Sequence, residues 1–119
     1  MILADTSVWV DHLRSEDHEL ATLLREGMVL GHPFVVGELA CGSLSDREHF
    51  LHLLAALPQA EVAEHEEVLQ LVRSRRLYGR GLGWIDMHLL ASAFLERCVL
   101  WTLDKRLETV AGELGVAAR

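Results

Sequence analysis

The sequence predicts an α/β fold with a largely parallel central sheet and helices on both of its faces. Two observations predict it. Short apolar runs of buried-strand length alternate along the chain with segments of helical periodicity. The length of 119 residues, half of them apolar, suits one domain with a sizeable core. We therefore expect a single three-layer α/β/α domain over residues 1–119.

The N-terminal half is expected to alternate apolar strands with amphipathic helices. Asp5 ends the first apolar run, and Thr6 and Ser7 follow it, a polar sequence typical of a helix cap. Gly27 ends the second helix, and Pro33 fits the first turn of the third. In order, the expected elements are a strand over 2–4, a helix over 8–13, a helix over 18–26, a strand over 28–30, a helix from 33 to about 42, a helix capped at 45 or 46 that ends at 56, and a possible strand over 60–63.

The C-terminal half is expected to contain three helices and a buried strand. Segment 64–78 is polar on one side and apolar on the other, and three glycines between 79 and 83 interrupt it. In parallel sheets of this kind the binding crevice lies beyond the carboxyl ends of the strands. In order, the expected elements are helices over 64–78 and 84–96, a strand over 99–101, a helix over 104–114 and a short final strand around Val116.

Composition excludes several classes of protein. The net charge of −7 argues against a simple electrostatic nucleic-acid binder, because such proteins are normally basic. No apolar run approaches the roughly 18–20 residues that span a bilayer, and the first residues do not resemble a secretory signal. Cys41 and Cys98 form no CxxC pair, which favours reduced thiols in a cytoplasmic protein. The seven histidines form no zinc-binding spacing, and we expect them to be surface or partly buried residues.

Four of the 18 acidic residues stand in unusual surroundings. Asp5 and Asp104 follow predicted strands, whereas Glu38 and Asp86 are expected at early positions of apolar helices. Each has an ordinary explanation: a helix cap for Asp5 and Asp104, an exposed face or an arginine partner for Glu38, and a first-turn dipole contact for Asp86. A shared site explains all four at once, because a carboxylate in apolar surroundings is costly unless it is paired or metal-bound.

A shared carboxylate site predicts a divalent cation. Clustered carboxylates raise one another's pKa, and an oxygen-only ligand set favours Mg²⁺ or Mn²⁺. Such an ion, bound by Asp5, Asp86 and Asp104, suits metal-assisted hydrolysis of a phosphodiester. Thr6 and Thr102 are hydroxyl donors beside these acids, and each either binds an acid, a water or a phosphate oxygen or serves as a cap.

The basic residues gather next to the third acid. Four of the eleven fall within eight positions, at the end of a helix and in the glycine segment before Asp86. The cluster either complements a helix dipole or clamps the phosphate groups of a substrate. The candidate phosphate contacts are Arg73, Arg75, Arg76 and Arg80, together with Lys105 and Arg106 after Asp104, and Arg14 after the first helix.

Four segments of the chain resemble the acidic motifs of PIN-domain ribonucleases of the VapC toxin type. They are residues 1–14 (MILADTSVWVDHLR), Gly37-Glu38-Leu39, residues 85–93 around Asp86, and residues 101–107 (WTLDKRL). The segments follow one another in the family's order and span nearly the whole chain. The resemblance implies a PIN-like α/β/α domain that cleaves RNA endonucleolytically with Mg²⁺ or Mn²⁺. The resemblance further implies that the catalytic acids are Asp5, Glu38, Asp86 and Asp104, and that the hydroxyls of Thr6 and Thr102 support them.

The resemblance also implies partners, while the residues leave two other functions open. It implies a homodimer and inhibition by a cognate VapB-type antitoxin; segments 45–57 and 18–27 offer apolar grooves or simply face the core. One alternative is an aspartyl-phosphate phosphatase with Asp5 as nucleophile, although Ser7 stands where such enzymes usually carry a second acid. The other is an acidic receiver or interaction module that binds Mg²⁺ without nuclease activity. We expect a cytoplasmic protein with no membrane partner.

Overall fold

The computed structural model describes residues 1–15 and 19–118, and it confirms the predicted α/β/α fold. Within these residues three short strands form a parallel sheet in the order β2-β1-β3. Ile2 of the central strand stands opposite Val29 on one side and Val99 on the other. Leu3 and Ala4 are completely buried, as expected for a parallel strand covered on both faces. The strands are β1 (Ile2–Ala4), β2 (Val29–Leu30) and β3 (Val99–Trp101).

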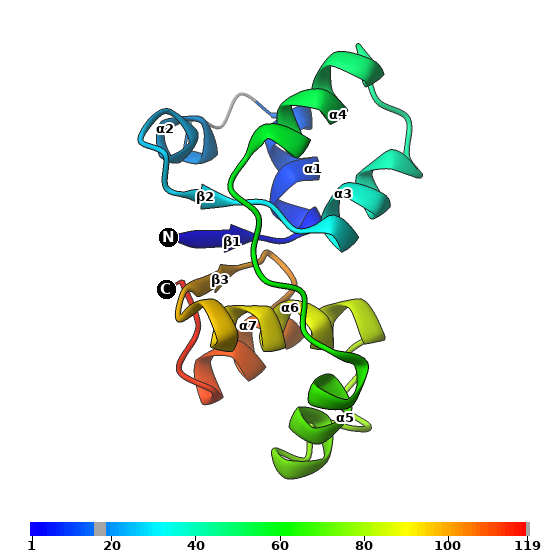
Figure 1. The fold of residues 1–119 in the computed structure, drawn as a ribbon, viewed down its shortest axis with the longest axis vertical. Helices are drawn as coiled ribbons and strands as arrows, with labels where there is room; N and C mark the ends of the chain where they lie inside the picture. Colours follow the sequence, from blue (N-terminus) through cyan, green and yellow to red (C-terminus); the bar gives the residue numbers. More distant parts are fainter. Residues whose placement is uncertain (16–18, 119) are drawn as a thin grey trace.

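Seven helices in the described part of the chain surround this sheet. The first four occupy the upper half of Figure 1, on the β2 side, and the last three occupy the lower half, on the β3 side. None of the described helices is long and apolar enough to cross a membrane. The helices are α1 (Thr6–Arg14), α2 (Glu19–Arg25), α3 (Pro33–Ala40), α4 (Arg47–Ala56), α5 (His65–Ser74), α6 (Trp84–Glu96) and α7 (Lys105–Glu113).

Helix α6 forms the centre of the C-terminal half. Its residues Met87–Ala93 are all buried, so the helix has no solvent-facing side over two turns. It begins and ends where the sequence predicts, and the expected bounds of β1 and β3 are also confirmed. The second helix is confirmed over Glu19–Arg25, while His18, its expected first residue, lies outside the described residues.

The expected strand over 60–63 is wrong. A single parallel bridge joins Gly31 to the residue before this segment, and the chain then leaves the sheet. The carbonyl of Glu61 accepts a hydrogen bond from the Ser92 hydroxyl at 2.7 Å, and its N–H donates to the Glu96 carboxylate at 2.6 Å. Side chains of α6 therefore take the backbone groups that a strand would offer to a sheet.

The last strand and the end of α5 differ most from the expected bounds. The final strand around Val116 is reduced to one bridge between Leu100 and Ala117. Helix α5 ends at Ser74 rather than near 78, because Arg76 adopts a left-handed conformation with φ of 54°. The chain thus turns before the glycine segment, which brings buried Leu77 back to the core.

Candidate active site

Asp5 lies at the carboxyl end of the central strand and caps helix α1. Its Oδ1 accepts hydrogen bonds from the backbone N–H groups of Ser7 and Val8 at 2.9 and 3.3 Å, and from the Ser7 hydroxyl. Its Oδ2 accepts a hydrogen bond from the Thr102 hydroxyl at 2.6 Å. Only 6% of the residue is exposed. The capping interpretation of Asp5 is therefore correct, and the cap also holds the carboxylate in one orientation.

Hydroxyl groups connect the end of β1 to the chain that follows β3. The Ser7 hydroxyl accepts a hydrogen bond from the Leu103 N–H, and the Thr102 hydroxyl accepts one from the Asp104 N–H, each at 3.0 Å. Asp104 in turn caps α7, since its Oδ1 accepts from two backbone N–H groups of the first turn at 2.9 and 3.2 Å. Asp5 and Asp104 thus lie at the same edge of the sheet, and both are N-caps.

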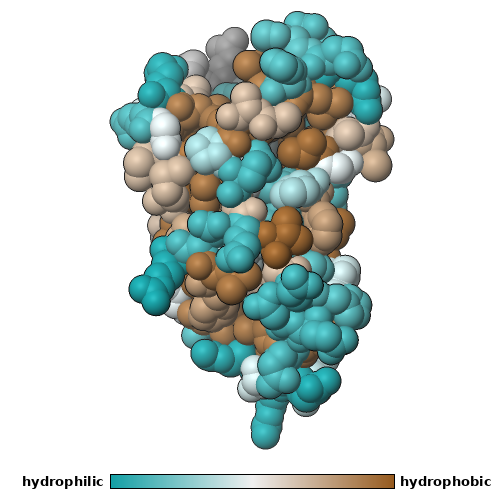
Figure 2. Space-filling view, viewed as in Figure 1, coloured by the Kyte–Doolittle hydropathy of each residue, from teal (hydrophilic) through white to brown (hydrophobic). Residues whose placement is uncertain are grey.

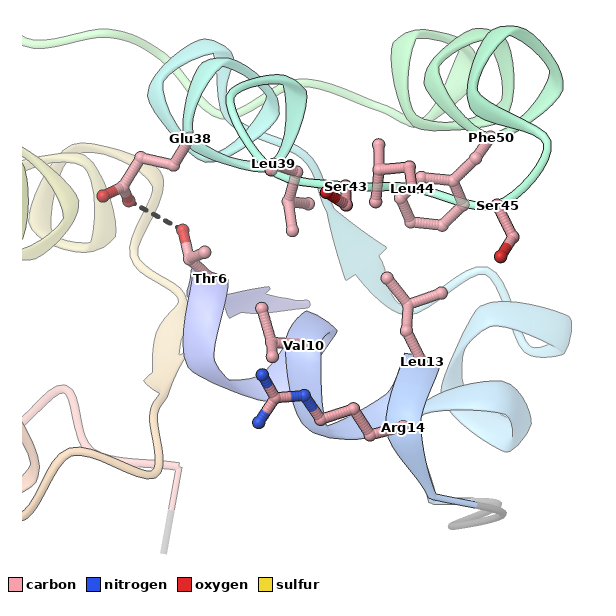
Figure 3. Close-up of a pocket in the computed structure, with 11 residues that line it drawn as sticks. Thr6, Val10, Leu13, Arg14, Glu38, Leu39, Ser43, Leu44, Ser45 and Phe50 are labelled. Atoms are coloured by element: carbon pink, nitrogen blue, oxygen red, sulfur yellow. Dashed lines mark hydrogen bonds between the residues drawn. The ribbon is translucent and has the colours of Figure 1, made fainter.

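Glu38 approaches this edge from helix α3. The Thr6 hydroxyl, in the first residue of α1, donates a hydrogen bond to Glu38 Oε1 at 2.7 Å (Figure 3). The expected early position of Glu38 is wrong, because α3 ends only two residues later, at Ala40. The residue is exposed, as one of its ordinary explanations predicted, but its partner is a threonine rather than an arginine.

Asp86 enters from the first turn of α6. Its Oδ2 accepts a hydrogen bond from the Gly83 N–H at 3.0 Å, which completes the cap of that helix. Burial raises the pKa of Asp86, and the negative charges of Asp104, Asp5 and Glu38 raise it further, although the Gly83 N–H opposes them. The charges of the other three predicted acids therefore all reach Asp86, beyond the carboxyl ends of β1 and β3.

The carboxylates do not form a ready chelating group. Within residues 1–15 and 19–118, no three His, Cys, Asp or Glu side chains lie in the arrangement of a metal ligand set. Both oxygens of Asp5, and one oxygen each of Glu38, Asp86 and Asp104, accept hydrogen bonds from hydroxyl or backbone N–H groups of the chain. A divalent ion held here would take one or two carboxylates and complete its shell with other oxygens, which is the usual habit of Mg²⁺.

The basic residues before Asp86 have different partners. Arg80 makes two hydrogen bonds of 2.6 Å to the carboxylate of Glu113, and this contact raises the pKa of Arg80 and lowers that of Glu113. The Arg75 guanidinium lies 5.8 Å from the centre of the Phe94 ring. Arg73 donates to a glutamine one turn earlier, and Arg76 occupies the left-handed turn. The structure does not bring these four side chains to one point.

The two basic residues after Asp104 lie beside the candidate site. Arg106 packs against the backbone of Gly81, where an added Cβ would lie 2.7 Å from the guanidinium. Lys105 is 3.8 Å from Glu108 on the exposed side of α7. The glycine segment thus rests on α7 close to the start of α6, which positions Asp86 relative to Asp104.

His32 is a structural residue that sequence analysis missed. It is completely buried and caps α3, with Nδ1 accepting a hydrogen bond from the Phe34 N–H at 3.0 Å. Its Nε2 lies 3.0 Å from the Ser92 hydroxyl, which donates to the Glu61 carbonyl. Burial, and then the neighbouring His88, lower the pKa of His32 to about 4. Its position directly before Pro33, the first helical residue, is the signal that could have identified this cap.

Comparison with known proteins places the chain in a protein family. A family model described as PIN domain matches residues 2–113. The chain therefore belongs to the PIN-domain family. Ribonuclease VapC32 of Mycobacterium tuberculosis, in strains CDC 1551 / Oshkosh and ATCC 25618 / H37Rv, is 52% identical over 118 residues, which cover 98% of this chain and 95% of the relative. Within the family the chain is thus of the VapC type, and neither alternative function class is favoured.

Proposed function

We propose that this protein is a toxin endoribonuclease of the VapC type, which hydrolyses RNA phosphodiester bonds with the help of Mg²⁺ or Mn²⁺. The observation that carries the proposal is the group of four acids, Asp5, Glu38, Asp86 and Asp104, beyond the carboxyl ends of β1 and β3. Burial raises the pKa of Asp86, and the charges of the other three acids raise it further. Such a concentration of negative charge needs a counter-charge in order to remain ionised. The VapC-type relationship supplies the choice of RNA as substrate.

The donor chemistry of the site fits a hard divalent cation. All candidate ligands are carboxylate oxygens. Of Asp5, Asp86 and Asp104, one or two would bind the ion directly and the remainder would hold it through water. When bound, the ion would polarise a phosphate oxygen and lower the pKa of a coordinated water. Two hydroxyl groups keep Asp5 from rotating, so the metal side of the site is organised before substrate arrives.

Glu38 has a different role from the other three acids. It is exposed, and Thr6 fixes one of its two oxygens. The second oxygen can accept a proton or orient a water molecule beside the phosphate. We therefore assign Glu38 to positioning the attacking water, and Thr6 to orienting Glu38.

The basic residues contact the phosphate groups of the RNA. Lys105 and Arg106 are the principal contacts, because they follow Asp104 directly and lie in the first turn of α7. Arg80 has to leave Glu113 in order to bind a phosphate. Arg73, Arg75 and Arg76 are more distant contacts, which a longer RNA would reach along α5. Because the net charge of the protein is −7, we expect it to bind RNA weakly outside these basic contacts.

The test is cleavage of total cellular RNA by the purified protein, with the new ends mapped by sequencing. Asp5→Asn and Asp86→Asn are expected to lower the rate on the order of 100-fold or more. Asp11→Asn, which changes an exposed acid on α1, is the matched control and keeps full activity. Removal of divalent metal by EDTA abolishes cleavage, and Mg²⁺ or Mn²⁺ restores it. Full activity in both site variants, free of contaminating nuclease, would refute the proposal.

A VapB-like antitoxin is the proposed partner. Apolar side chains reach the surface over α1 and α4 in the upper half of the molecule (Figure 2). Leu13 of α1 and Leu53 of α4 are 47% and 51% exposed, and both line an apolar cavity of about 420 Å³ between α1, α2 and α4. Co-purification with the product of the neighbouring reading frame tests this partner. Leu53→Asp is expected to abolish the complex and keep RNA cleavage, whereas Leu95→Asp, at an exposed leucine of α6, keeps both.

The remaining expectations come from the resemblance to the family. We propose a homodimer, for which light scattering after size exclusion should give twice the 13.3 kDa mass of the chain. We also propose a cytoplasmic location, which cell fractionation tests. A monomer at all accessible concentrations, or recovery with the membranes, would contradict these two expectations.

A further inference from the structure

We propose that a cavity next to Glu38 binds one unpaired nucleotide of the RNA and thereby selects the sequence that is cleaved. The cavity has a volume of about 350 Å³ and lies between α1, α3 and the chain leading into α4. A volume of this size is within the range of small-ligand pockets. This inference rests on the proposed ribonuclease function and adds the element that recognises a base.

The position of the cavity connects it to the candidate active site. Thr6 and Glu38, which are joined by their 2.7 Å hydrogen bond, form one end of it (Figure 3). A phosphate held at the four acids therefore has an adjoining nucleotide at the mouth of this cavity.

The walls have the chemical character that an unstacked base requires. Val10, Leu44 and Phe50 provide apolar surface, and Ser43 and Ser45 provide hydroxyl groups that can donate or accept. Single-stranded RNA is read in this way, by bases that leave the stack, lie against aromatic or arginine planes and form hydrogen bonds at their edges. The Phe50 ring makes an edge-on contact with the Trp9 ring, with the ring centres 6.0 Å apart and the planes at 75°.

Arg14 supplies the positive charge that a nucleotide needs. It is the last residue of α1 and lines the cavity, and its guanidinium extends back along the helix to lie beside Val10 (Figure 3). It makes no ion pair with another residue in the described part of the chain, unlike Arg80. Arginine binds phosphate oxygens in a bidentate manner, so Arg14 fits a phosphate of the bound nucleotide.

The test measures binding of the four ribonucleoside 5′-monophosphates to the metal-free protein by NMR, which does not depend on cleavage. We expect saturable shifts at Ser43 and Ser45, with a preference among the four bases. Phe50→Leu keeps the apolar volume but removes the aromatic plane, and is expected to weaken binding roughly fivefold or more. Arg14→Gln is expected to weaken monophosphate binding about tenfold and to leave nucleoside binding unchanged. Arg25→Gln, on α2, is the matched control and has no effect.

A second measurement separates this inference from the proposed function. A randomised single-stranded RNA library is incubated with Mg²⁺ and each of three proteins: the wild type, Phe50→Leu and Ser43→Phe. The Ser43→Phe substitution fills the cavity. We expect both variants to melt near the wild-type temperature, to keep cleaving and to lose the wild-type sequence preference. Cleavage with an unchanged preference, or variants that alter only antitoxin binding, would overturn the inference while the ribonuclease stands. Nucleotide binding in the cavity without any RNA cleavage would instead overturn the proposed function.

Discussion

Acidification should destabilise this protein through His32, which is buried in its neutral form. The Phe34 N–H donates to Nδ1, and the Ser92 hydroxyl uses its proton on the Glu61 carbonyl. The second ring nitrogen, Nε2, must therefore carry the hydrogen and donate it to the Ser92 oxygen. A second proton could only go to Nδ1, where it would face the Phe34 N–H and break the cap of α3.

The size of the effect follows from the two pKa values of His32. The ordinary value is 6.5, and burial lowers the value in the folded protein to about 4. A difference of about 2.5 pH units corresponds to about 3 kcal/mol of unfolding free energy, since one unit is worth about 1.4 kcal/mol. Above pH 6.5 neither state binds the proton, so nothing is lost. As the pH falls from 6.5 to about 4, the unfolded chain binds the proton first, and stability falls over this window.

The assay is urea unfolding at a series of pH values between 7.5 and 4.5 for the wild type and His32→Asn. Asparagine can still cap the helix but does not titrate, so the variant is expected to be less stable at pH 7.5 and less sensitive to acid. The slope of unfolding free energy against pH should differ between the two by at most about 1.4 kcal/mol per unit. His49→Gln, at an exposed histidine of α4, serves as the control. Equal slopes for the wild type and His32→Asn would refute the reasoning.

Three further predictions concern the candidate site. Asp86→Asn should raise the urea midpoint of the metal-free protein at pH 7. The pKa of Asp86 is raised in the folded protein, so its ionised carboxylate lowers the free energy of unfolding at neutral pH, and protonation in acid removes this loss. A lower midpoint for the variant would contradict this. Thr102→Val should lower stability by about 1–3 kcal/mol, since it removes a donor to Asp5 and an acceptor at a buried position; the rate of RNA cleavage should fall as well, and unchanged activity would count against an orienting role. Gly81→Ala should lower the free energy of unfolding by about 1 kcal/mol or more, because Gly81 has a φ of +82° and its backbone lies against Arg106. In thermal unfolding, the double variant with Arg106→Ala should regain only the stability lost to the steric contact. Full recovery of stability would show that the backbone conformation is not strained.

Much of the fold could be predicted because its signals are local. Strands β1 and β3 and helix α6 have the predicted bounds, since each is an apolar run that ends at a polar cap or a turn residue. Asp5 and Asp104 were recognised both as caps and as site residues, and the structure makes them caps. Carboxylates in apolar sequence are conspicuous because their burial is costly, so the four acids could be found without a structure.

The errors in prediction have the opposite origin. The strand expected over 60–63 is replaced by contacts with Ser92 and Glu96, which stand more than thirty positions away. The arginines before Asp86 are close together in sequence, whereas in the structure Arg80 pairs with Glu113 and Arg75 lies over Phe94; their role as phosphate contacts stays a prediction. Closeness in sequence does not fix the direction of a long side chain, because its partners come from other elements.

The sequence by itself determined the order of β1–β3 and α1–α7, the caps at Asp5 and Asp104 and the identity of the four acids, because each of these depends on residues only a few positions apart. Only the tertiary structure decided how the acids behave. The Thr102 hydroxyl that holds Asp5 is 97 positions away in the chain, and the charges that raise the pKa of Asp86 come from three other elements. The proton affinity of a carboxylate depends on its burial and on the charges around it, and folding alone brings these together.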